Sequence, residues 1–325
     1  MYSGSASEKP VLAAVEQADV LISVGVRFTD NTTTGFSQQI APERTIDVQP
    51  FATQIGDRLF APLQMKVAVQ ELTGLVCELG QGWQPSEFPA DVREPQTGEA
   101  LRQAQLWSAV ERFLRPGDIV VAEQGSAFFG AQSVRLPADV TFTGQPLWGS
   151  IGYTLPAALG AQTAAPTRRT ILLIGDGSAL LTAQELGTMR EGRNPVIVLI
   201  NNDGYTVERA IHGPEQRYND IPRWNWSLVP AAMGAGEHTR TLRATTPAEL
   251  SVALESVADP RGLVLLEAML PTMDLPEALA AAARAMAAAN ASALRPAVGS
   301  NWRRHHQRRA RTSDYQRREA APAWT

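Results

Sequence analysis

The sequence predicts an α/β protein whose larger part is a doubly wound, mostly parallel sheet. Two observations support this fold class. After residue 101, short apolar runs rich in Val, Ile and Leu alternate with segments of helical periodicity, which is typical of strands buried between two layers of helices. The chain also has 325 residues, of which 44% are hydrophobic, and this is enough for two domains with buried cores.

The first 77 residues predict part of an α/β domain. Residues 11–19 have the periodicity of an amphipathic helix, and the β-branched run 20–24 predicts a strand. Residues 45–48 predict a second strand, and residues 64–76 repeat apolar side chains at helical spacing. Because two strands do not complete a sheet, we expect residues 1–77 to be a partial central (middle) domain.

A linker and a second domain follow. Residues 78–100 are rich in Pro, Gly and Gln and lack periodicity, as linkers do. The domain expected over 101–291 begins with a helix over 101–114 and ends in an alanine-rich helix over 277–293. Its strands are predicted at 119–122, 141–143, 171–174, 196–200 and 263–267. In such a sheet, ligands bind at the carboxyl ends of the strands.

Composition and charge exclude several classes of function. The net charge of -4 gives no general electrostatic reason to bind nucleic acid. No apolar run approaches the roughly 20 residues that span a bilayer, and residues 1–10 lack an apolar signal core. A single cysteine, Cys77, excludes an intramolecular disulfide and a CxxC metal site. We therefore expect a cytoplasmic protein with no nucleic-acid or membrane partner.

The last segment, residues 292–325, differs from the rest. It carries eight arginines against Asp314 and Glu319, and few aromatic residues lie between them. A basic arm for nucleic acid or a membrane surface is one interpretation. Because the remainder of the chain is acidic, we expect instead a disordered extension without a function of its own.

The most informative stretch is a strand that runs into a glycine-bracketed acid. The apolar residues 171–174 are followed by Gly175, Asp176, Gly177 and Ser178. The glycines permit a tight turn whose backbone N–H groups face an anion, and the Asp176 carboxylate lies where a cation could neutralise that anion. This pattern predicts a site for phosphate and metal.

The next predicted strand ends in a second polar turn, Asn201-Asn202-Asp203-Gly204-Tyr205. Adjacent parallel strands place their carboxyl ends side by side. One carboxylate, one amide oxygen and one turn carbonyl can therefore converge on a hard cation. Magnesium that bridges a diphosphate is the natural occupant of such a site.

Other interpretations of the first turn were weighed on the same residues. A Rossmann fingerprint needs a third glycine at position 180, where this chain has Leu180. A P-loop needs GxxxxGK[ST], which is not in the sequence. A plain strand-to-helix turn with a capping acid stays open for Gly175–Ser178 alone, and its pairing with the second turn disfavours it.

Together these motifs resemble the thiamine diphosphate-dependent 2-keto acid decarboxylases, within the pyruvate, phenylpyruvate and indolepyruvate decarboxylase group. The stretches that carry the resemblance are QPLWGSIGY at 145–153, LTAQEL at 181–186, YTVERAIHG at 205–213, EQRYND at 215–220, YSGSAS at 2–7 and GVRFTDNTTTGF at 25–36. The resemblance covers residues 2 to about 291. It implies the thiamine diphosphate-binding fold, thiamine diphosphate and Mg²⁺ as cofactors, and non-oxidative decarboxylation of an aromatic or branched 2-keto acid to an aldehyde.

The resemblance also implies roles for individual residues at the cofactor. It implies that Asp176, Asn202 and the Gly204 carbonyl bind magnesium. It implies that Ile151 holds the cofactor in a bent form and that the Gly149 carbonyl accepts a hydrogen bond from its aminopyrimidine, which favours a short proton transfer within the cofactor. The residues alone leave Ile151 open as core and Gly149 as a simple turn. The other residues implied at the cofactor are Gly125, Ser126, Gly175, Gly177, Ser178 and Tyr205.

Glu208 resembles the acid that lies beside the bound substrate in this family. In a dry pocket its pKa would be raised, so that it could carry a proton near neutrality. The sequence alone allows a solvated glutamate paired with Arg209 or another neighbour. The implied substrate pocket contains Gln124, Phe128 and Phe129. Phe128 stands where this group commonly has a small residue, so we expect it to narrow the pocket, which puts indolepyruvate in doubt as substrate.

The resemblance begins midway through the family's middle domain, so we expect the pyrimidine-binding domain to be absent from this chain. With it go the glutamate that drives the cofactor's imino tautomer and an adjacent histidine pair. His305 and His306 lie outside the resemblance and are not expected to replace that pair. We expect a homo-oligomer or a partner chain that supplies this domain. The alternatives are a catalytically silent cofactor-binding fragment and an acetolactate synthase-like carboligase, which residues 205–213 disfavour.

Overall fold

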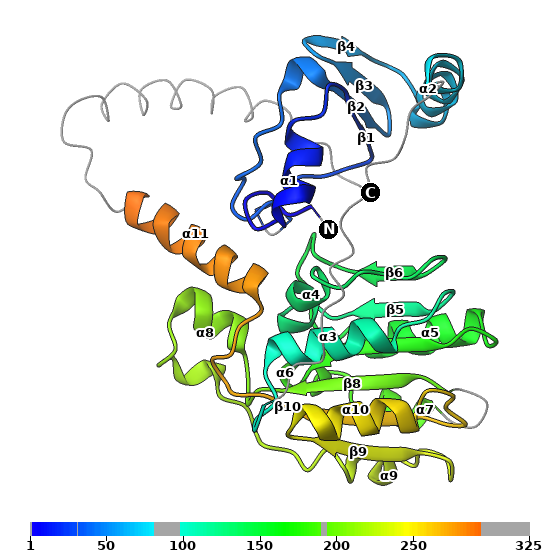
Figure 1. The fold of residues 1–325 in the computed structure, drawn as a ribbon, viewed down its shortest axis with the longest axis vertical. Coiled ribbons are helices and arrows are strands. Elements are labelled where there is room, and N and C mark those ends of the chain that lie inside the picture. The colour runs from blue at the N-terminus through cyan, green and yellow to red at the C-terminus, as the bar shows by residue number, and fades with distance from the viewer. Residues whose placement is uncertain (1, 31, 81–97, 190–193, 294–325) are drawn as a thin grey trace, which may run out of the picture. The chain divides into compact units, whose positions relative to one another are not determined.

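The computed structural model describes residues 2–30, 32–80, 98–189 and 194–293. It contains a four-stranded sheet within residues 21–60 and a six-stranded sheet within residues 119–269 (Figure 1). Most of the predicted linker, 81–97, and the predicted tail from residue 294 onward, with His305 and His306, lie outside the described residues.

The smaller sheet has the strand order β1-β2-β3-β4. β1 (Leu21–Val24) and β2 (Thr45–Gln49) are the two predicted strands and run parallel. β3 (Ala52–Ile55) and β4 (Arg58–Phe60) extend the sheet as antiparallel strands that the sequence analysis missed. They are only four and three residues long, although the Gly56-Asp57 turn between them is a typical hairpin signal.

The helices of this part lie close to their predicted positions. α1 spans Lys9–Glu16 and begins two residues earlier than predicted, because Pro10 in its first turn suits a helix start. α2 spans Met65–Leu79, and its only fully buried side chain is Ala68. A short 3₁₀ helix, η1 (Pro42–Arg44), leads into β2.

The larger sheet has the order β6-β5-β7-β8-β10-β9, and every neighbouring pair is parallel. This confirms the predicted fold class in a stricter form, since the sheet is entirely parallel. One strand, β9, was not predicted because it is a polar edge strand, RTLRA, with a single buried residue. The strands are β5 (Ile119–Ala122), β6 (Thr141–Gly144), β7 (Thr170–Gly175), β8 (Val196–Asn201), β9 (Arg240–Ala244) and β10 (Val264–Met269).

Both faces of this sheet are buried, and successive strand residues alternate between two cores. Leu173 and Val198 belong to one core, while Leu172 and Ile197 belong to the other. This explains why the central strands β5, β7 and β8 are almost entirely apolar rather than alternating. α3 (Gln103–Phe113), α4 (Ser126–Ala131) and α10 (Pro247–Ser256) contribute to the first core.

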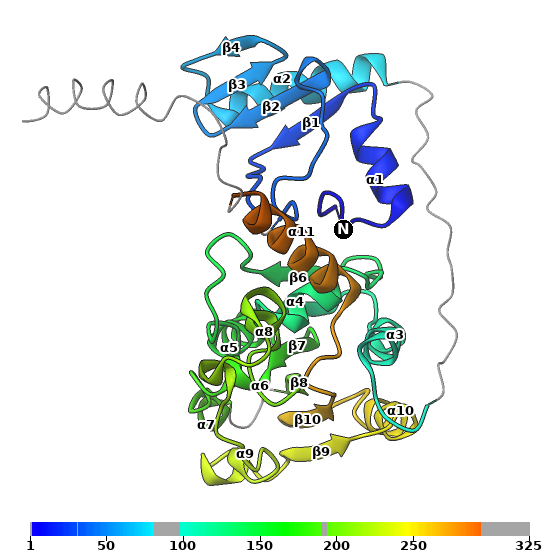
Figure 2. The same ribbon diagram turned by 90° about the vertical axis from the view of Figure 1, so that its left-hand side faces the viewer.

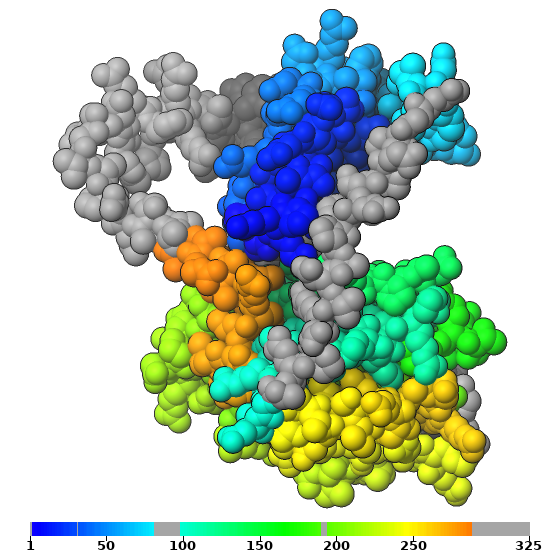
Figure 3. All heavy atoms as spheres, in the orientation of Figure 1, coloured from blue at the N-terminus to red at the C-terminus, as the bar shows by residue number. Residues whose placement is uncertain are grey.

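The second core is closed by α5 (Thr154–Ala164), α6 (Asp176–Ala179), α7 (Glu185–Thr188) and α9 (Val229–Ala232). Figure 2 shows the sheet edge-on, with α3 and α10 on one side and α5, α7 and α9 on the other. In the space-filling view of Figure 3, the atoms of α3 and α10 cover the sheet from the viewer's side. The layers are therefore helix, sheet and helix, as the doubly wound fold requires.

A third, smaller core lies near the carboxyl ends of the strands. α8 (Thr206–His212), followed by η2 (Arg217–Asn219), packs Val207 and Ala210 against Phe129. Leu279 and Ala282 of α11 (Glu277–Ala293) close this cluster. None of the helices in the described ranges is long and apolar enough to cross a membrane.

Alanine substitution is expected to have opposite effects on stability at two helical glycines, one packed between α3 and α4 and one exposed on α5. A Cβ on Gly130 in α4 would lie 1.8 Å from Trp107 Cε2, so Gly130→Ala overpacks this contact and is expected to lower the free energy of unfolding by about 1–3 kcal/mol. Gly160 in α5 is exposed, and a Cβ there meets nothing within 4 Å. Gly160→Ala should raise the free energy of unfolding by up to about 1 kcal/mol.

Urea unfolding of the two variants beside the wild type is the measurement. Equal effects of the two substitutions would show that the α3–α4 contact is looser than the structure has it.

Candidate active site

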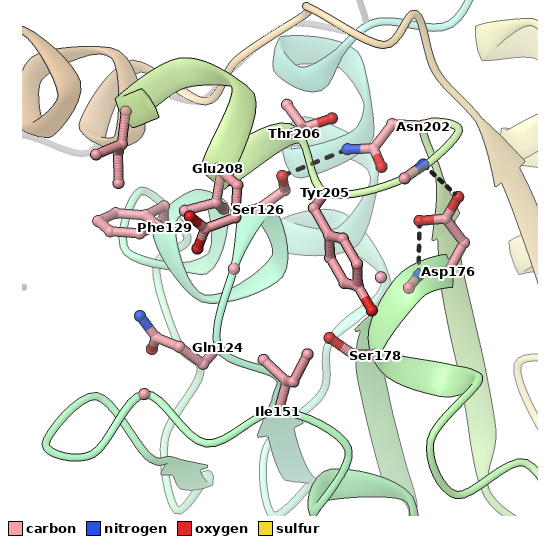
Figure 4. A pocket seen from close by; sticks show the side chains of 17 residues that line it. Gln124, Ser126, Phe129, Ile151, Asp176, Ser178, Asn202, Tyr205, Thr206 and Glu208 are labelled. Atoms are coloured by element: carbon pink, nitrogen blue, oxygen red, sulfur yellow. Dashed lines mark hydrogen bonds between the residues drawn. The ribbon is translucent and has the colours of Figure 1, made fainter. Parts of the chain in front are cut away.

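An open cavity of about 200 Å³ lies where β5, β7 and β8 end (Figure 4). The chain reverses its direction across the sheet here, because it passes from β6 back over β5 to β7. This is the topological position at which parallel α/β sheets bind ligands. All but one of the residues predicted for the site line it: Gln124, Gly125, Ser126, Phe129, Gly149, Ile151, Gly175, Asp176, Gly177, Ser178, Asn202, Gly204, Tyr205 and Glu208.

Asp176 is held at the end of β7 by backbone donors from two strand ends. Its Oδ1 accepts a hydrogen bond from Gly177 N at 2.9 Å, and its Oδ2 accepts one from Gly204 N at 3.0 Å. The side chain is buried, and this burial raises the pKa of Asp176 to about 6, although the backbone donors oppose the shift. The carboxylate is therefore fixed in place, and among the described residues no basic side chain forms an ion pair with it.

The Asn202 side chain brings a second oxygen to this carboxylate. One end of its amide lies 3.1 Å from Gly204 O and 3.3 Å from Asp176 Oδ1, and the structure places the amide oxygen at that end. Three oxygens that face one another repel, unless a cation lies between them. Adjacent ligands of an octahedral magnesium ion are about 3.0 Å apart, given metal–oxygen distances of about 2.1 Å.

The reverse orientation of the amide has a different meaning. With nitrogen at that end, Asn202 donates to Gly204 O and Asp176 Oδ1, and its oxygen accepts from Thr206 Oγ1 at 2.9 Å. The orientation with the Asn202 oxygen toward Gly204 O therefore suits a bound cation. The orientation with the Asn202 nitrogen toward Gly204 O suits the protein without a cation. The residues present fit a metal ion.

The donor set also indicates which metal chemistry is suitable. In the described part of the chain, no three His, Cys, Asp or Glu side chains come together as a metal site. A cation at Asp176 has one carboxylate, one amide and one carbonyl as protein ligands. Magnesium is typically held in this way, with water and phosphate oxygens completing its coordination.

Ionic contacts outside the cavity stabilise the turn that carries the Gly204 carbonyl. The buried Arg209 donates to Asp203 O at 2.9 Å and to Asp220 Oδ1 at 2.8 Å. Arg223 donates to the Asp203 side chain, and this bond lowers the pKa of Asp203. Asp203 has a φ of 63°, a conformation that Asp and Asn adopt more readily than most residues. The turn is thus held from outside, and Gly204, whose carbonyl also accepts a hydrogen bond from Thr206 N at 3.0 Å, lines the cavity.

Gly177 and Tyr205 shape the middle of the cavity. A Cβ on Gly177 would lie 2.5 Å from Tyr205 Cε1, so only glycine lets the tyrosine ring approach the turn this closely. In Figure 4 the Tyr205 side chain points toward Ser178. α6 is a single turn of four residues, which makes the strand-end backbone and the Ser178 hydroxyl, rather than a long helix, the groups available to a phosphate.

The opposite side of the cavity is formed by Gln124, Gly149, Ile151 and Glu208. Ile151 remains 38% exposed although it is a large apolar residue. The Glu208 carboxylate lies 3.4 Å from His212 Nε2, and its side chain is 46% exposed. Glu208 therefore pairs with His212 rather than with Arg209, and the described residues do not supply the dry surroundings expected for it.

Phe128 is the one predicted site residue that does not line the cavity. Its side chain is 6% exposed, belongs to the core between the sheet and α3, and contacts the Phe142 ring with centroids 6.2 Å apart. Successive residues on a helix point about 100° apart, so Phe129 faces the cavity while Phe128 faces the sheet. The expectation that Phe128 narrows the pocket is contradicted by this placement, and so is the reason for doubting indolepyruvate.

Sequence analysis missed several residues at the cavity. Thr206, Val207 and Ile211 also line it, and the four-residue spacing of Val207 and Ile211 in α8 was a signal that they share a face. Behind the cavity wall lies a further acid, Glu123, which is 0% exposed. Its position directly after the apolar strand β5 was the only indication in the sequence.

Comparison with known proteins agrees with this geometry. Residues 125–268 match the family described as "Thiamine pyrophosphate enzyme, C-terminal TPP binding domain", and residues 1–73 match "Thiamine pyrophosphate enzyme, central domain". The first match contains the Asp176, Asn202 and Gly204 cluster.

Curated relatives carry the name "Alpha-keto-acid decarboxylase". The protein of Mycobacterium ulcerans (strain Agy99) is 50% identical over 284 residues, which are 86% of this chain and 50% of the relative. That of Mycobacterium leprae (strain TN) is 48% identical over 291 residues, which are 87% of this chain and 51% of the relative. The chain thus spans about half the length of the curated relatives it matches. Its two matched domains show that the chain belongs to the thiamine pyrophosphate enzymes, whose cofactor is thiamine diphosphate.

Proposed function

We propose that this chain forms the magnesium and diphosphate side of a thiamine diphosphate-dependent decarboxylase that converts an aromatic or branched 2-keto acid to an aldehyde. The observation that carries this proposal is the convergence of the Asp176 carboxylate, the Asn202 amide and the Gly204 carbonyl at the carboxyl ends of β7 and β8. The names of the relatives support the class of reaction. We assign the cofactor domain to residues 101–291 and the partial central domain to residues 1–77.

The cofactor's diphosphate end would be held by the cluster and the turn beside it. Asp176, Asn202 and the Gly204 carbonyl would bind Mg²⁺, which neutralises the diphosphate. Gly125, Ser126, Gly175, Gly177, Ser178 and Tyr205 surround the same space. Their backbone groups and hydroxyls provide hydrogen bonds for phosphate oxygens.

The other side of the cavity would orient the rings of the cofactor. When bound, thiamine diphosphate supplies a thiazolium that accepts the electrons of the broken carbon–carbon bond. Ile151 offers an apolar surface and Gly149 a carbonyl acceptor on the wall that faces this space. Glu208 would hold or donate a proton beside the substrate carboxylate.

The substrate end of the cavity is apolar. Phe129, Val207 and Ile211 line it, and Gln124 adds a polar group. Phe128 leaves this space free because its ring lies in the core. Such a lining favours an aromatic or branched side chain on the 2-keto acid over the methyl group of pyruvate.

The open side of the cavity supports a second protein surface as part of the complete site. Ligand pockets typically have volumes of at least about 300 Å³ and bury most of the ligand, whereas this cavity has about 200 Å³. Glu208 and Ile151 remain partly exposed. We propose that a pyrimidine-binding domain, in a homo-oligomer or from a partner chain, covers this side and dries it.

A catalytically silent cofactor-binding chain is the second candidate. The observation that favours it is the exposure of Glu208, since a solvated carboxylate next to the substrate is a poor proton donor near neutral pH. The two candidates agree on cofactor binding and differ in turnover.

Cofactor binding is expected to depend on magnesium. Calorimetric titration of the chain with thiamine diphosphate should show binding with Mg²⁺ and little without it. Asp176→Asn removes the only carboxylate of the cluster and should lower the affinity by more than about 100-fold, which corresponds to about 3 kcal/mol.

Asp259→Asn is the matched control, because it makes the same chemical change at an exposed side chain that pairs with Arg115 and does not line the cavity, and it should keep wild-type affinity. Magnesium-independent binding, or equal loss in both variants, would contradict the assignment.

The buried carboxylate also predicts a pH-dependent difference in stability. Because the folded-state pKa of Asp176 is raised to about 6 from 3.8, the charged form destabilises the fold above that pH, and this cost disappears as the pH falls toward 4. In magnesium-free buffer, Asp176→Asn should therefore gain on the order of 2–3 kcal/mol relative to wild type between pH 4 and pH 8. Urea unfolding at both pH values measures it, and a pH-independent difference would contradict the raised pKa.

Turnover should require the covering domain and Glu208. We expect no carbon dioxide release from phenylpyruvate or indolepyruvate by the chain alone, and release when the pyrimidine-binding domain of a relative is supplied. In that assembly Glu208→Gln should lower kcat by about 100-fold or more. Glu215→Gln, at an exposed residue beyond α8, serves as the control. No release from the assembly, with cofactor bound, would favour the silent chain.

A further inference from the structure

The buried acid behind the cavity, Glu123, has hydrogen-bond partners on two different walls. Its Oε2 accepts from Gly152 N at 2.9 Å and from Thr154 Oγ1 at 2.7 Å. Its Oε1 accepts from Gln124 N at 2.9 Å. Glu123 thus links the end of β5 by hydrogen bonds to residues 149–154, called the 149–154 segment below.

The backbone of Glu123 cannot move to follow this segment. Glu123 N donates to Leu173 O of β7 at 2.9 Å, and Glu123 O accepts from Phe128 N of α4 at 3.0 Å. The acid is therefore anchored to the middle of the sheet. The groups that are hydrogen-bonded to its carboxylate are therefore positioned relative to the sheet.

Part of the 149–154 segment has little packing of its own, whereas Gly152 and Thr154 are buried. Gly149 and Ile151 line the cavity, and Ile151 is 38% exposed. The next residue, Gly152, is fixed at both ends of its backbone: its N–H donates to Glu123, and its carbonyl accepts from Thr182 Oγ1 at 2.6 Å. The position of Ile151 over the cavity thus follows from the hydrogen bonds of Gly152.

The chemistry of these contacts explains why an acid occupies position 123. Both carboxylate oxygens accept from N–H or O–H donors, whereas a glutamine has only one acceptor oxygen and would turn an NH₂ group toward a donor. In the described part of the chain, no basic side chain forms an ion pair with Glu123. Burial raises its pKa, while the bonds from Thr154, Gly152 and Gln124 partly oppose that shift. A charge that is costly to bury is retained where only a carboxylate accepts all three bonds.

We propose that Glu123 is a positioning residue that ties the 149–154 segment to the end of β5 and so sets the position of Ile151 and Gly149 against the cofactor's rings. Glu123 itself is buried behind the wall and touches neither cofactor nor substrate. This inference rests on the proposed function, because it assumes that thiamine diphosphate occupies the cavity.

The test compares two ligands of the full-length chain by calorimetry in the presence of Mg²⁺. Thiamine diphosphate would contact both the metal cluster and the 149–154 segment, whereas inorganic pyrophosphate would contact the cluster alone. Glu123→Gln should weaken thiamine diphosphate binding by about 10- to 100-fold, as loss of a supporting residue does, and should change pyrophosphate binding by less than about twofold. Faster hydrogen exchange at the Gly152 amide would report the broken tie directly.

Two variants at Thr154 keep the test decisive if Glu123→Gln does not fold. Thr154→Val removes the hydroxyl that donates to Oε2 and should show the same selective loss in a smaller degree, while Thr154→Ser keeps the hydroxyl and should restore binding. Equal weakening of both ligands, or unchanged thiamine diphosphate affinity in folded variants, would overturn the positioning role. Failure of the wild type to bind thiamine diphosphate would instead reject the proposed function.

Discussion

The parallel alignment of β5, β7 and β8 is the constraint on which the site depends. Since neighbouring strands run in the same direction, their carboxyl ends lie side by side, and the turns that follow them share one edge. Asp176 follows β7 and Asn202 follows β8, and a backbone bond from Gly204 N to Asp176 Oδ2 joins the two turns. Residues far apart in the sequence meet here without any contribution from long loops.

The same alignment of strands buries carboxylates that the site needs, which lowers the stability of the fold at this edge of the sheet. The sheet buries Asp176 and Glu123 among apolar strands, and both pKa values are raised by that burial. Neither carboxylate forms an ion pair in the described part of the chain. Buried carboxylates that have hydrogen-bond donors but no partner of opposite charge are typical of functional sites. We interpret Asp176 as a metal ligand, and Glu123 as a hydrogen-bond acceptor that positions the backbone of residues 149–154.

Much of this arrangement could be predicted from the sequence, because the central strands β5, β7 and β8 are almost entirely apolar and are followed by polar turns. The Asp176 and Asn202 turns show this most clearly, since strand order alone brings them together. Strands with weaker patterns were missed: β9 is a polar edge strand, and β3 and β4 are very short. Side-chain direction was harder to predict than position, because whether Phe128 or Phe129 faces the cavity depends on how α4 is rotated against the sheet.

We expect three oxygens of this chain to hold a metal ion on a diphosphate. A crystal structure of the chain soaked with Mn²⁺ and thiamine diphosphate tests it most directly, since manganese gives an anomalous signal. We expect a single strong peak about 2.1–2.2 Å from Asp176 Oδ1, the Asn202 amide oxygen and Gly204 O. A peak elsewhere, or Asn202 with its amide nitrogen facing Gly204 O in the presence of bound cofactor, would contradict this assignment.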